Sequence, residues 1–319
     1  MTGNRSLLVI LAMAFATACG TAPDGEPAED TAFAKSADDE TLDPADPPTD
    51  PDPADDPLTV ADIATRGNGN AAGCPKRSDL LSPKGLTLVI HISKNAGNGR
   101  DAIDHLVNMR GYLRARDIFM VERTTPMLDE LQKTFPCNAF HFIAYPSEVD
   151  RALETGGRID GVALDWEGAA VDSNSVGYSV DKLAAFAKKV RASGRAAGLV
   201  PAWSPRFDDA SIARAAKMDY DLAQIQPACV NSAAAFGHRA REMLVAFKER
   251  GIGLRNVGFE ISMDSYSVAP NNVGPDRAAD CTEIAYRKGA RSIYLYGNGP
   301  DRLVPYLQKL SHRGLRKKR

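Results

Sequence analysis

Residues 159–167 read Ile-Asp-Gly-Val-Ala-Leu-Asp-Trp-Glu, an apolar segment that ends in two acidic side chains. Its length and composition predict a buried β-strand over Ile159–Asp165. An amphipathic pattern follows over Val180–Ser193, and Gly194 comes directly after it, where a glycine commonly ends a helix. A second apolar segment then begins at Ala196. This part of the chain therefore predicts a strand–helix–strand unit.

The same alternation of apolar strand and amphipathic helix occurs eight times from residue 86 onward. The predicted strands are Leu86–Ile92, Asp117–Val121, Ala139–Tyr145, Ile159–Asp165, Ala196–Ala202, Tyr220–Pro227, Asn256–Met263 and Ser292–Tyr296. Gly251 and Gly289 follow two more of the predicted helices. Strict alternation predicts a parallel sheet, and eight units in about 230 residues fit an α/β fold of the (β/α)8 TIM-barrel type. The alternative is a doubly wound open sheet. That fold usually has a glycine-rich phosphate turn after its first strand, and Gly97-Asn98-Gly99 matches such a turn only in part.

Asp165 and Glu167 are the candidate catalytic residues. Alternate residues of a strand point to the same face, so the two carboxylates share a face and lie roughly 6.5–7 Å apart along the chain. Two like charges at this spacing perturb each other's ionisation, which suits general acid–base chemistry on a glycosidic bond. In a barrel, the carboxyl ends of the strands form the rim that carries active sites. The alternative is a strand end with two solvated acids.

Residues 160–167, Asp-Gly-Val-Ala-Leu-Asp-Trp-Glu, resemble the signature of glycoside hydrolase family 18, the group of chitinases and endo-β-N-acetylglucosaminidases. That signature reads Asp-Gly-apolar-Asp-apolar-Asp-aromatic-Glu, and Ala163 replaces its inner Asp. The resemblance implies a (β/α)8 barrel in which Glu167 is the acid/base and Asp165 orients the substrate's N-acetyl group. It also implies a retaining, substrate-assisted reaction, in which the acetamido oxygen attacks the anomeric carbon and no enzyme nucleophile is needed.

Other residues at predicted strand ends are candidates for binding the substrate. Aromatic rings stack on sugar faces and amides hydrogen-bond to hydroxyls, and the candidates of these kinds are Tyr145, Trp203, Gln224, Gln226, Tyr296 and Asn298. The resemblance implies that Gln226 replaces a strand-6 Tyr that contacts the acetamido group, and that Tyr296 replaces a strand-8 Trp. Each of these residues could instead serve packing. Glu260 lies in mid-strand and is interpreted as a buried barrel acid rather than a catalyst.

Two functions remain open on this fold. The first is a glycoside hydrolase that acts on N-acetylglucosamine-containing glycans. The second is a catalytically inactive glycan-binding protein, which the loss of an acid at Ala163 and the missing strand-6 Tyr favour. Glycoside hydrolase family 25 lysozymes are a second resemblance, because they also end strand 4 with Asp-x-Glu, but their first-strand Asp motif has no clear match here. We expect a monomer whose partner is a glycan.

Residues 1–19 resemble a bacterial lipoprotein signal peptide. Arg5 precedes the apolar run Leu7–Ala16, and Cys19 follows shortly after the run. We expect Cys19 to be lipidated and to become the mature N-terminus; the alternative is an ordinary cleaved signal. Residues 20–79 predict a disordered acidic tether, because Pro, Asp and Ala bury too little surface to offset the cost of ordering them. The protein is expected to be exported and lipid-anchored in the bacterial cell envelope, at the outer membrane or cell surface, or otherwise secreted.

Four cysteines remain after Cys19, and an even number in an exported protein predicts two disulfides. They lack CxxC spacing, which argues against zinc, and we expect neither a metal nor another cofactor. Cys74 and Cys137 precede strands 1 and 3, near the amino-terminal end of the barrel. Cys229 follows strand 6 and Cys281 lies in the helix after strand 7, near the opposite end. The predicted pairs are therefore Cys74–Cys137 and Cys229–Cys281.

The folded part is predicted to be one barrel domain over residues 80–312. A basic tail, 313–319, follows and is predicted to be solvated and frayed. Because no aromatic residue interrupts the basic residues of the tail, and the whole chain has a formal net charge of −2, nucleic-acid binding is not indicated.

Overall fold

The structure of the chain is a computed structural model. It describes Cys74 and residues 85–92, 104, 106–122, 128–154, 159–165, 180–201, 217–249, 257–263, 272–296 and 300–316. The predictions for the signal peptide, for Cys19, for nearly all of the tether and for residues 317–319 lie outside the described residues.

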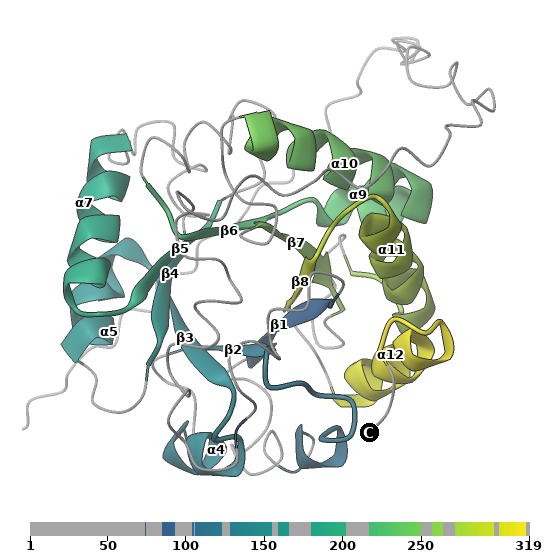
Figure 1. Cartoon of the computed structure of the whole chain (residues 1–319), viewed down its shortest axis with the longest axis horizontal. Coiled ribbons are helices and arrows are strands. Elements are labelled where there is room, and N and C mark those ends of the chain that lie inside the picture. The colour runs from purple at the N-terminus through teal and green to yellow at the C-terminus, as the bar shows by residue number, and fades with distance from the viewer. Residues whose placement is uncertain are drawn as a thin grey trace, which may run out of the picture. The chain divides into compact units, whose positions relative to one another are not determined.

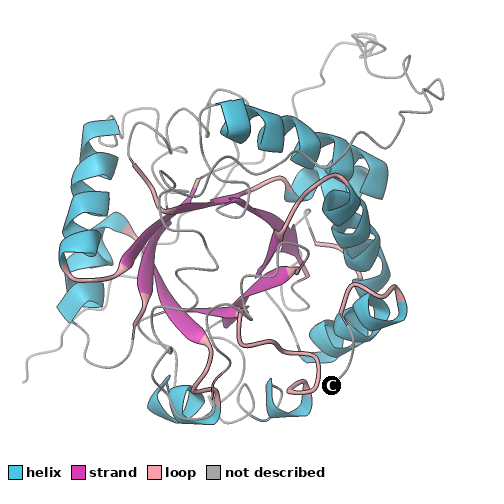
Figure 2. Ribbon diagram, in the orientation of Figure 1, coloured by secondary structure: helices cyan, strands magenta, loops and turns pink. Residues whose placement is uncertain are grey.

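Eight parallel strands close into a barrel, each paired with its neighbours in sequence and β8 paired with β1 (Figures 1 and 2). They are β1 (Thr87–Ile92), β2 (Ile118–Val121), β3 (Ala139–Ala144), β4 (Gly161–Asp165), β5 (Ala196–Val200), β6 (Tyr220–Ala223), β7 (Val257–Ser262) and β8 (Ser292–Tyr296). The (β/α)8 prediction is confirmed. The open-sheet alternative is wrong, because an open sheet leaves its edge strands unpaired.

The described helices surround the barrel (Figure 2). They are α4 (Leu128–Thr134), the 3-10 helix η2 (Pro146–Glu148), α5 (Val149–Glu154), α7 (Val180–Ala192), α9 (Gln226–Asn231), α10 (Ala233–Glu249), α11 (Pro275–Arg287) and α12 (Pro300–His312). Gly194 and Gly289 follow α7 and α11 with positive φ, as predicted, because glycine reaches this conformation without a Cβ clash. Gly251 lies outside the described residues. Across the described ranges, no helix has the length and apolar character needed to cross a bilayer.

Two of the predicted boundaries differ from the structure in ways that bear on the site. The sixth strand was predicted to run to Pro227 but ends at Ala223, and Gln226 begins α9. Proline lacks the N–H that a strand ladder needs and favours the first turn of a helix, so Pro227 lies in the first turn of α9 rather than extending β6. Similarly, the fifth strand ends at Val200 rather than Ala202.

The apolar side chains of the strands fall into two clusters. Outward-facing residues such as Leu88, Phe140 and Phe259 pack beneath the helices. Inward-facing residues fill the barrel and include Val89, Ile118, Met120, Ala139, Ala163, Ala196, Val200, Tyr220, Leu222 and Tyr294. In a barrel of this type, alternate strands contribute the four side chains of each interior layer. The interior is therefore a packed core, and a ligand can reach only its ends.

Near the amino-terminal end of the barrel, two buried rings span the interior. His141 of β3 and the hydroxyl of Tyr220 of β6 lie 2.9 Å apart. Two glycines on the strands between them leave room for the rings: a Cβ on Gly161 would lie 2.8 Å from His141 Nδ1, and one on Gly198 would lie 2.0 Å from Tyr220 Cζ. Gly161 belongs to the Asp-Gly pair of the sequence motif, and its role here is to accommodate His141.

The buried His141 predicts a loss of stability in acid. Burial lowers the pKa of His141 to about 3, whereas an unfolded histidine titrates near 6.5. As pH falls below about 6.5, His141 takes up a proton in the unfolded chain but stays neutral in the folded chain. The free energy of unfolding therefore falls by about 1.4 kcal/mol per pH unit. Between pH 7 and pH 5, His141 should therefore lower the free energy of unfolding by about 2 kcal/mol. Denaturant unfolding at the two pH values should show a correspondingly smaller change in His141→Gln, and equal changes in both proteins would contradict this prediction.

Three aspartates that precede even-numbered strands accept a hydrogen bond from the backbone N–H of the preceding strand. The pairs are Asp117 with Leu88 (3.0 Å), Asp160 with Phe140 (2.9 Å) and Asp219 with Ala197 (2.8 Å). Each bond fixes one strand against its neighbour at the amino-terminal end of the barrel. Asp160, the first acid of the sequence motif, is therefore a structural residue, at the opposite end of β4 from Asp165.

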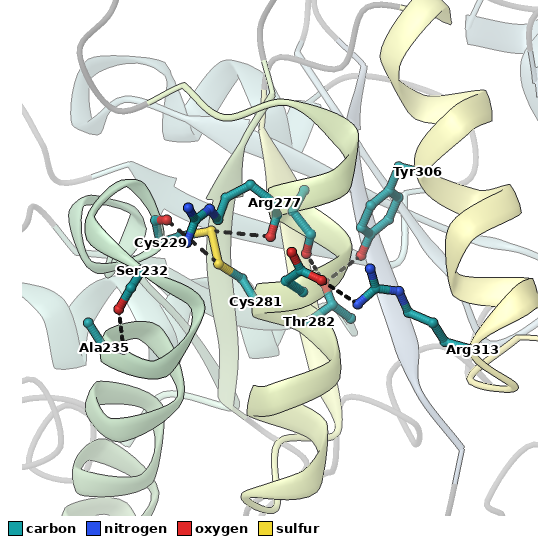
Figure 3. Close-up of a disulfide and its surroundings, with 10 residues drawn as sticks. Cys229, Ser232, Ala235, Arg277, Cys281, Thr282, Tyr306 and Arg313 are labelled. Atoms are coloured by element: carbon teal, nitrogen blue, oxygen red, sulfur yellow. Dashed lines mark hydrogen bonds and ion pairs between the residues drawn. A yellow bond between two sulfur atoms is a disulfide. The ribbon is translucent and has the colours of Figure 1, made fainter. Parts of the chain in front are cut away.

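Both predicted disulfides are confirmed. Cys74 is bonded to Cys137, and Cys229 is bonded to Cys281. The second bond ties α9 to α11, as Figure 3 shows. Next to it, the hydroxyls of Thr282 and Tyr306 lie 2.8 Å apart and join α11 to α12. The helices that follow β6, β7 and β8 are therefore cross-linked to one another.

The C-terminal tail differs from its prediction as far as it is described. Arg316 is buried and forms an ion pair with Asp117. Its guanidinium also donates to the carbonyl oxygens of Leu86 (3.2 Å) and Tyr112 (2.9 Å). The prediction of a solvated end is therefore wrong at Arg316, because a specific partner, Asp117, compensates the burial of its charge.

Candidate functional site at the carboxyl-terminal rim of the barrel

The strand registers bring four polar side chains into one layer at the carboxyl-terminal rim. Following the pairings around the barrel places Asp165 of β4 level with Tyr296 of β8, and with Glu122 and Gln224, which directly follow β2 and β6. These four residues are called the rim layer below. β4 and β8 are four strands apart and lie on opposite sides of the barrel (Figure 1). Asp165 and Tyr296, which end these strands, are therefore on opposite sides of the rim layer.

The rim layer is closed on one side and open on the other. Asp165 is 8% exposed and Gln224 is similarly buried. By contrast, Tyr296 is 42% exposed and the side chain of Glu122 is 24% exposed. Solvent therefore reaches the layer at Tyr296 and Glu122, whereas Asp165 and Gln224 are buried.

Asp165 occupies the predicted position: it ends β4 and points inward. Glu167, Trp203 and Asn298 lie outside the described residues. The structure therefore places one of the two predicted catalytic residues at the rim.

Ala163 lies in the interior layer two residues below Asp165. The registers place Met120, Leu222 and Tyr294 in the same layer, and all four residues are buried. This layer is apolar apart from the Tyr294 hydroxyl, and none of its four members supplies a carboxylate in place of the acid that the motif has lost. Glu260 is inward-facing and buried in the next layer up, which agrees with its interpretation as a buried barrel acid.

Gln224 and Gln226 are hydrogen-bonded to each other but belong to different elements of the site. Gln226 Nε2 donates a hydrogen bond of 3.2 Å to Gln224 Oε1, and both side chains are buried. Within the described ranges, no residue donates a hydrogen bond to the buried Gln226 Oε1. Because Gln226 begins α9 instead of continuing β6, Gln224 is the amide in the rim layer, and Gln226 is hydrogen-bonded to it. The role of Gln226 in contacting a substrate stays a prediction.

Tyr145 directly follows β3 and is 53% exposed. It sits at the N-terminus of η2, where its backbone N–H donates to Glu148 Oε2 at 3.3 Å. The short turn fixes the backbone of Tyr145 and leaves its ring in solvent, so it remains a candidate for contacting a ligand above the rim layer.

Sequence reasoning missed His91, Glu122, Ser262 and Asn272. His91 lies parallel to the Tyr296 ring, with centroids 4.8 Å apart. At the end of β7, the Ser262 hydroxyl hydrogen-bonds to the side chain of Asn272. The period of two along the first strand already indicated that His91 shares the face of Val89, but only the closure of the barrel brings His91 next to β8.

The described residues contain no group of three His, Cys, Asp or Glu side chains arranged to hold a metal ion.

No protein-family model matches this chain. No curated protein sequence matches it either. Among solved structures, the chain is similar to a GH18 chitinase from Pseudoalteromonas aurantia, with 10% identity, a TM-score of 0.51, and coverage of 71% of this chain and 99% of the chitinase. It is also similar to the YdjI aldolase from Escherichia coli K12, with 9% identity, a TM-score of 0.38, and coverage of 72% and 88%. At these identities the chitinase similarity supports the barrel fold, and the function must be argued from the site.

Proposed function

We propose that this protein is an exported glycoside hydrolase that cleaves glycans containing N-acetylglucosamine. Glu167 is its general acid/base and Asp165 orients the acetamido group of the substrate. The observation that carries the proposal is the position of Asp165, which ends β4 on the inward face in the rim layer, with Glu167 two residues further along. Paired acids at the carboxyl end of a barrel strand are typical of catalytic sites.

The reaction divides between the substrate and the two acids. Glu167 donates its proton to the glycosidic oxygen as the bond to the anomeric carbon breaks, and the acetamido oxygen of the substrate forms the new bond to that carbon. Asp165 accepts a hydrogen bond from the acetamido N–H and stabilises the positive charge that develops on the group. Glu167 then removes a proton from the water that opens the cyclic intermediate, so the configuration is retained.

Substrate binding falls to the rest of the rim. The exposed ring of Tyr296 offers a flat apolar surface for a sugar, and Tyr145 and Trp203 are further candidates for such stacking. The amide of Gln224, supported by Gln226, and Asn298 supply hydrogen bonds to hydroxyl or acetamido groups. Stacking supplies affinity for the sugar ring, whereas the amides select among its substituents.

A panel of oligosaccharides tests the proposal. Wild type should release reducing ends from chitin, peptidoglycan or N-glycan fragments. Cello-oligosaccharides are the matched control, since they have the linkage of chitin oligosaccharides but a hydroxyl in place of each acetamido group, and they should not be cleaved. Cleavage of both series would rule out a mechanism in which the substrate's acetamido group attacks.

A non-catalytic glycan-binding protein is the second candidate. It is favoured by Ala163, because the layer of Ala163 contains no carboxylate in place of the acid that the motif has lost. If wild type binds chitin oligosaccharides but cleaves nothing in the panel, this second function replaces the first.

The proposed cellular location is the bacterial envelope, with the barrel anchored through a lipid on Cys19. The two disulfides are compatible with an exported protein. Because stable anchoring depends on the acyl chains carried by this residue, Cys19→Ser should move the protein from the membrane fraction to the soluble fraction. Fractionation of cells expressing each form measures this, with Cys74→Ser as the control that removes a different cysteine. A variant at Cys19 that stays in the membrane fraction would contradict the anchor.

A further inference from the structure

His91, Glu122 and Tyr296 come from three adjacent strands and form a contact cluster at the open side of the rim. Tyr296 ends β8, His91 is the penultimate residue of β1, and Glu122 follows β2. The imidazole of His91 lies against the Tyr296 ring at 4.8 Å and an interplanar angle of 6°. At the edge of the imidazole ring, His91 Nε2 lies 3.5 Å from Glu122 Oε1.

A second tyrosine confines the Tyr296 ring from the side. The buried ring of Tyr294 meets Tyr296 edge-on at 6.4 Å and meets His91 edge-on at 6.5 Å. Tyr296 is thus supported on one face by a buried imidazole and at its edge by a buried phenol, while it remains 42% exposed. An exposed tyrosine without such contacts would sample several rotamers.

We propose that His91 is a positioning residue that holds Tyr296 flat as a sugar-stacking surface opposite Asp165. This inference rests on the proposed function in that the ligand is taken to be a glycan. The physical reason is preorganisation. Immobilising a flexible side chain on binding costs about 0.5–1.5 kcal/mol, and a ring that is already stacked does not incur that cost again. An aromatic pair of this geometry is itself worth about 0.5–1.5 kcal/mol, enough to hold the ring.

The arrangement also determines which part of the sugar Tyr296 can contact. Because β8 and β4 are opposite strands and the two residues share the rim layer, a sugar ring stacked on Tyr296 lies across the barrel mouth from Asp165. A fixed aromatic face selects pyranoses with an unbroken apolar face, which equatorial substituents leave free. His91 would therefore govern affinity for the ring of the sugar, and Asp165 and Gln224 its substituents.

Binding measurements by calorimetry test the inference. All variants carry Glu167→Gln so that the probe, N-acetylchitotetraose, is not cleaved. His91→Leu, which has similar bulk but no flat ring, should weaken binding about 3–10-fold. His91→Phe, which restores a flat ring, should bind within about twofold of the reference. The control His238→Leu removes the histidine of a His–Glu pair on the outer helix α10 and should leave affinity unchanged.

The outcomes separate this inference from the proposed function. If the reference binds the probe and His91→Leu binds equally well, His91 does not position Tyr296, although the glycan site stands. If His91→Phe is as weak as His91→Leu, a role for the flat ring is likewise overturned. If the reference binds neither N-acetylchitotetraose nor any other glycan of the panel, the proposed function fails and this inference fails with it.

A second pair of variants covers the case in which His91→Leu fails to fold, as judged from its thermal unfolding. Tyr296→Trp keeps a flat ring against His91 and should retain binding, whereas Tyr296→Leu should lose about 10-fold or more. Equal affinities for these two variants would overturn the stacking surface.

Discussion

Replacing Glu167 by glutamine is expected to lower hydrolysis of N-acetylglucosamine-containing oligosaccharides by about 10²–10⁴-fold, the usual effect of removing a positioned general acid. The amide has nearly the same size but cannot supply an acidic proton to the glycosidic oxygen. Binding should survive, because the stacking and amide contacts of Tyr296 and Gln224 do not involve Glu167. The measurements are the turnover rate and, separately, the affinity for the uncleaved oligosaccharide.

Two further inward-facing carboxyl groups, Asp165 and Glu260, serve as comparisons. Asp165→Asn should be less severe than Glu167→Gln when the leaving group is a good one, because the substrate's acetamido group can still attack. Glu260→Gln alters a buried acid that is also inward-facing but lies below the rim layer, and this variant should keep the wild-type rate if it folds. Wild-type turnover by Glu167→Gln would place the active site elsewhere. A large loss of turnover in Glu260→Gln alone would indicate that the catalytic acid is on β7.

The strands and the two disulfides could be predicted because their signals are local or topological. Period-two patterning, the glycine after α7 and the spacing of the cysteines relative to successive strands each constrain a short part of the chain. The end of β6 could not be placed in the same way. Apolar Ile225 continues the strand pattern of Tyr220–Ala223, and only the geometry around Pro227 decides that a helix begins at Gln226.

For the site, the sequence located Asp165 correctly because a strand's alternation fixes its inward face. It did not find His91, since a single histidine in an apolar strand has no distinguishing local pattern. Its significance arises from contacts with residues that follow it by 31 and 205 positions, Glu122 and Tyr296. Such contacts depend on the pairing of β1 with both β2 and β8, which exists only once the barrel closes.

The contacts of the C-terminal tail could not be predicted from the sequence for the same reason. The largest predicted effect on stability also concerns this tail. A cluster of basic residues at a chain end usually remains in solvent, and nothing near Arg316 in the sequence distinguishes it from its neighbours. Its partner Asp117 is 199 positions away and is fully buried. Asp117 also accepts hydrogen bonds from the backbone N–H groups of Leu88 (3.0 Å) and Arg114 (2.7 Å), so the carboxylate is fixed in place whether or not Arg316 is present.

Replacing Arg316 by methionine should therefore lower the free energy of unfolding by about 3–5 kcal/mol, because a buried carboxylate loses the charge that compensates it. Arg313→Met is the matched control. Arg313 pairs with Asp280 and Glu283 near the surface, where solvent screens the interaction, and its loss should cost about 1 kcal/mol or less. Denaturant unfolding of both variants at pH 7 measures the difference. Equal losses in the two variants would contradict this prediction. Asp117→Asn in the Arg316→Met protein tests the cause, because removing the carboxylate charge should restore part of the lost stability if an uncompensated charge was the cost.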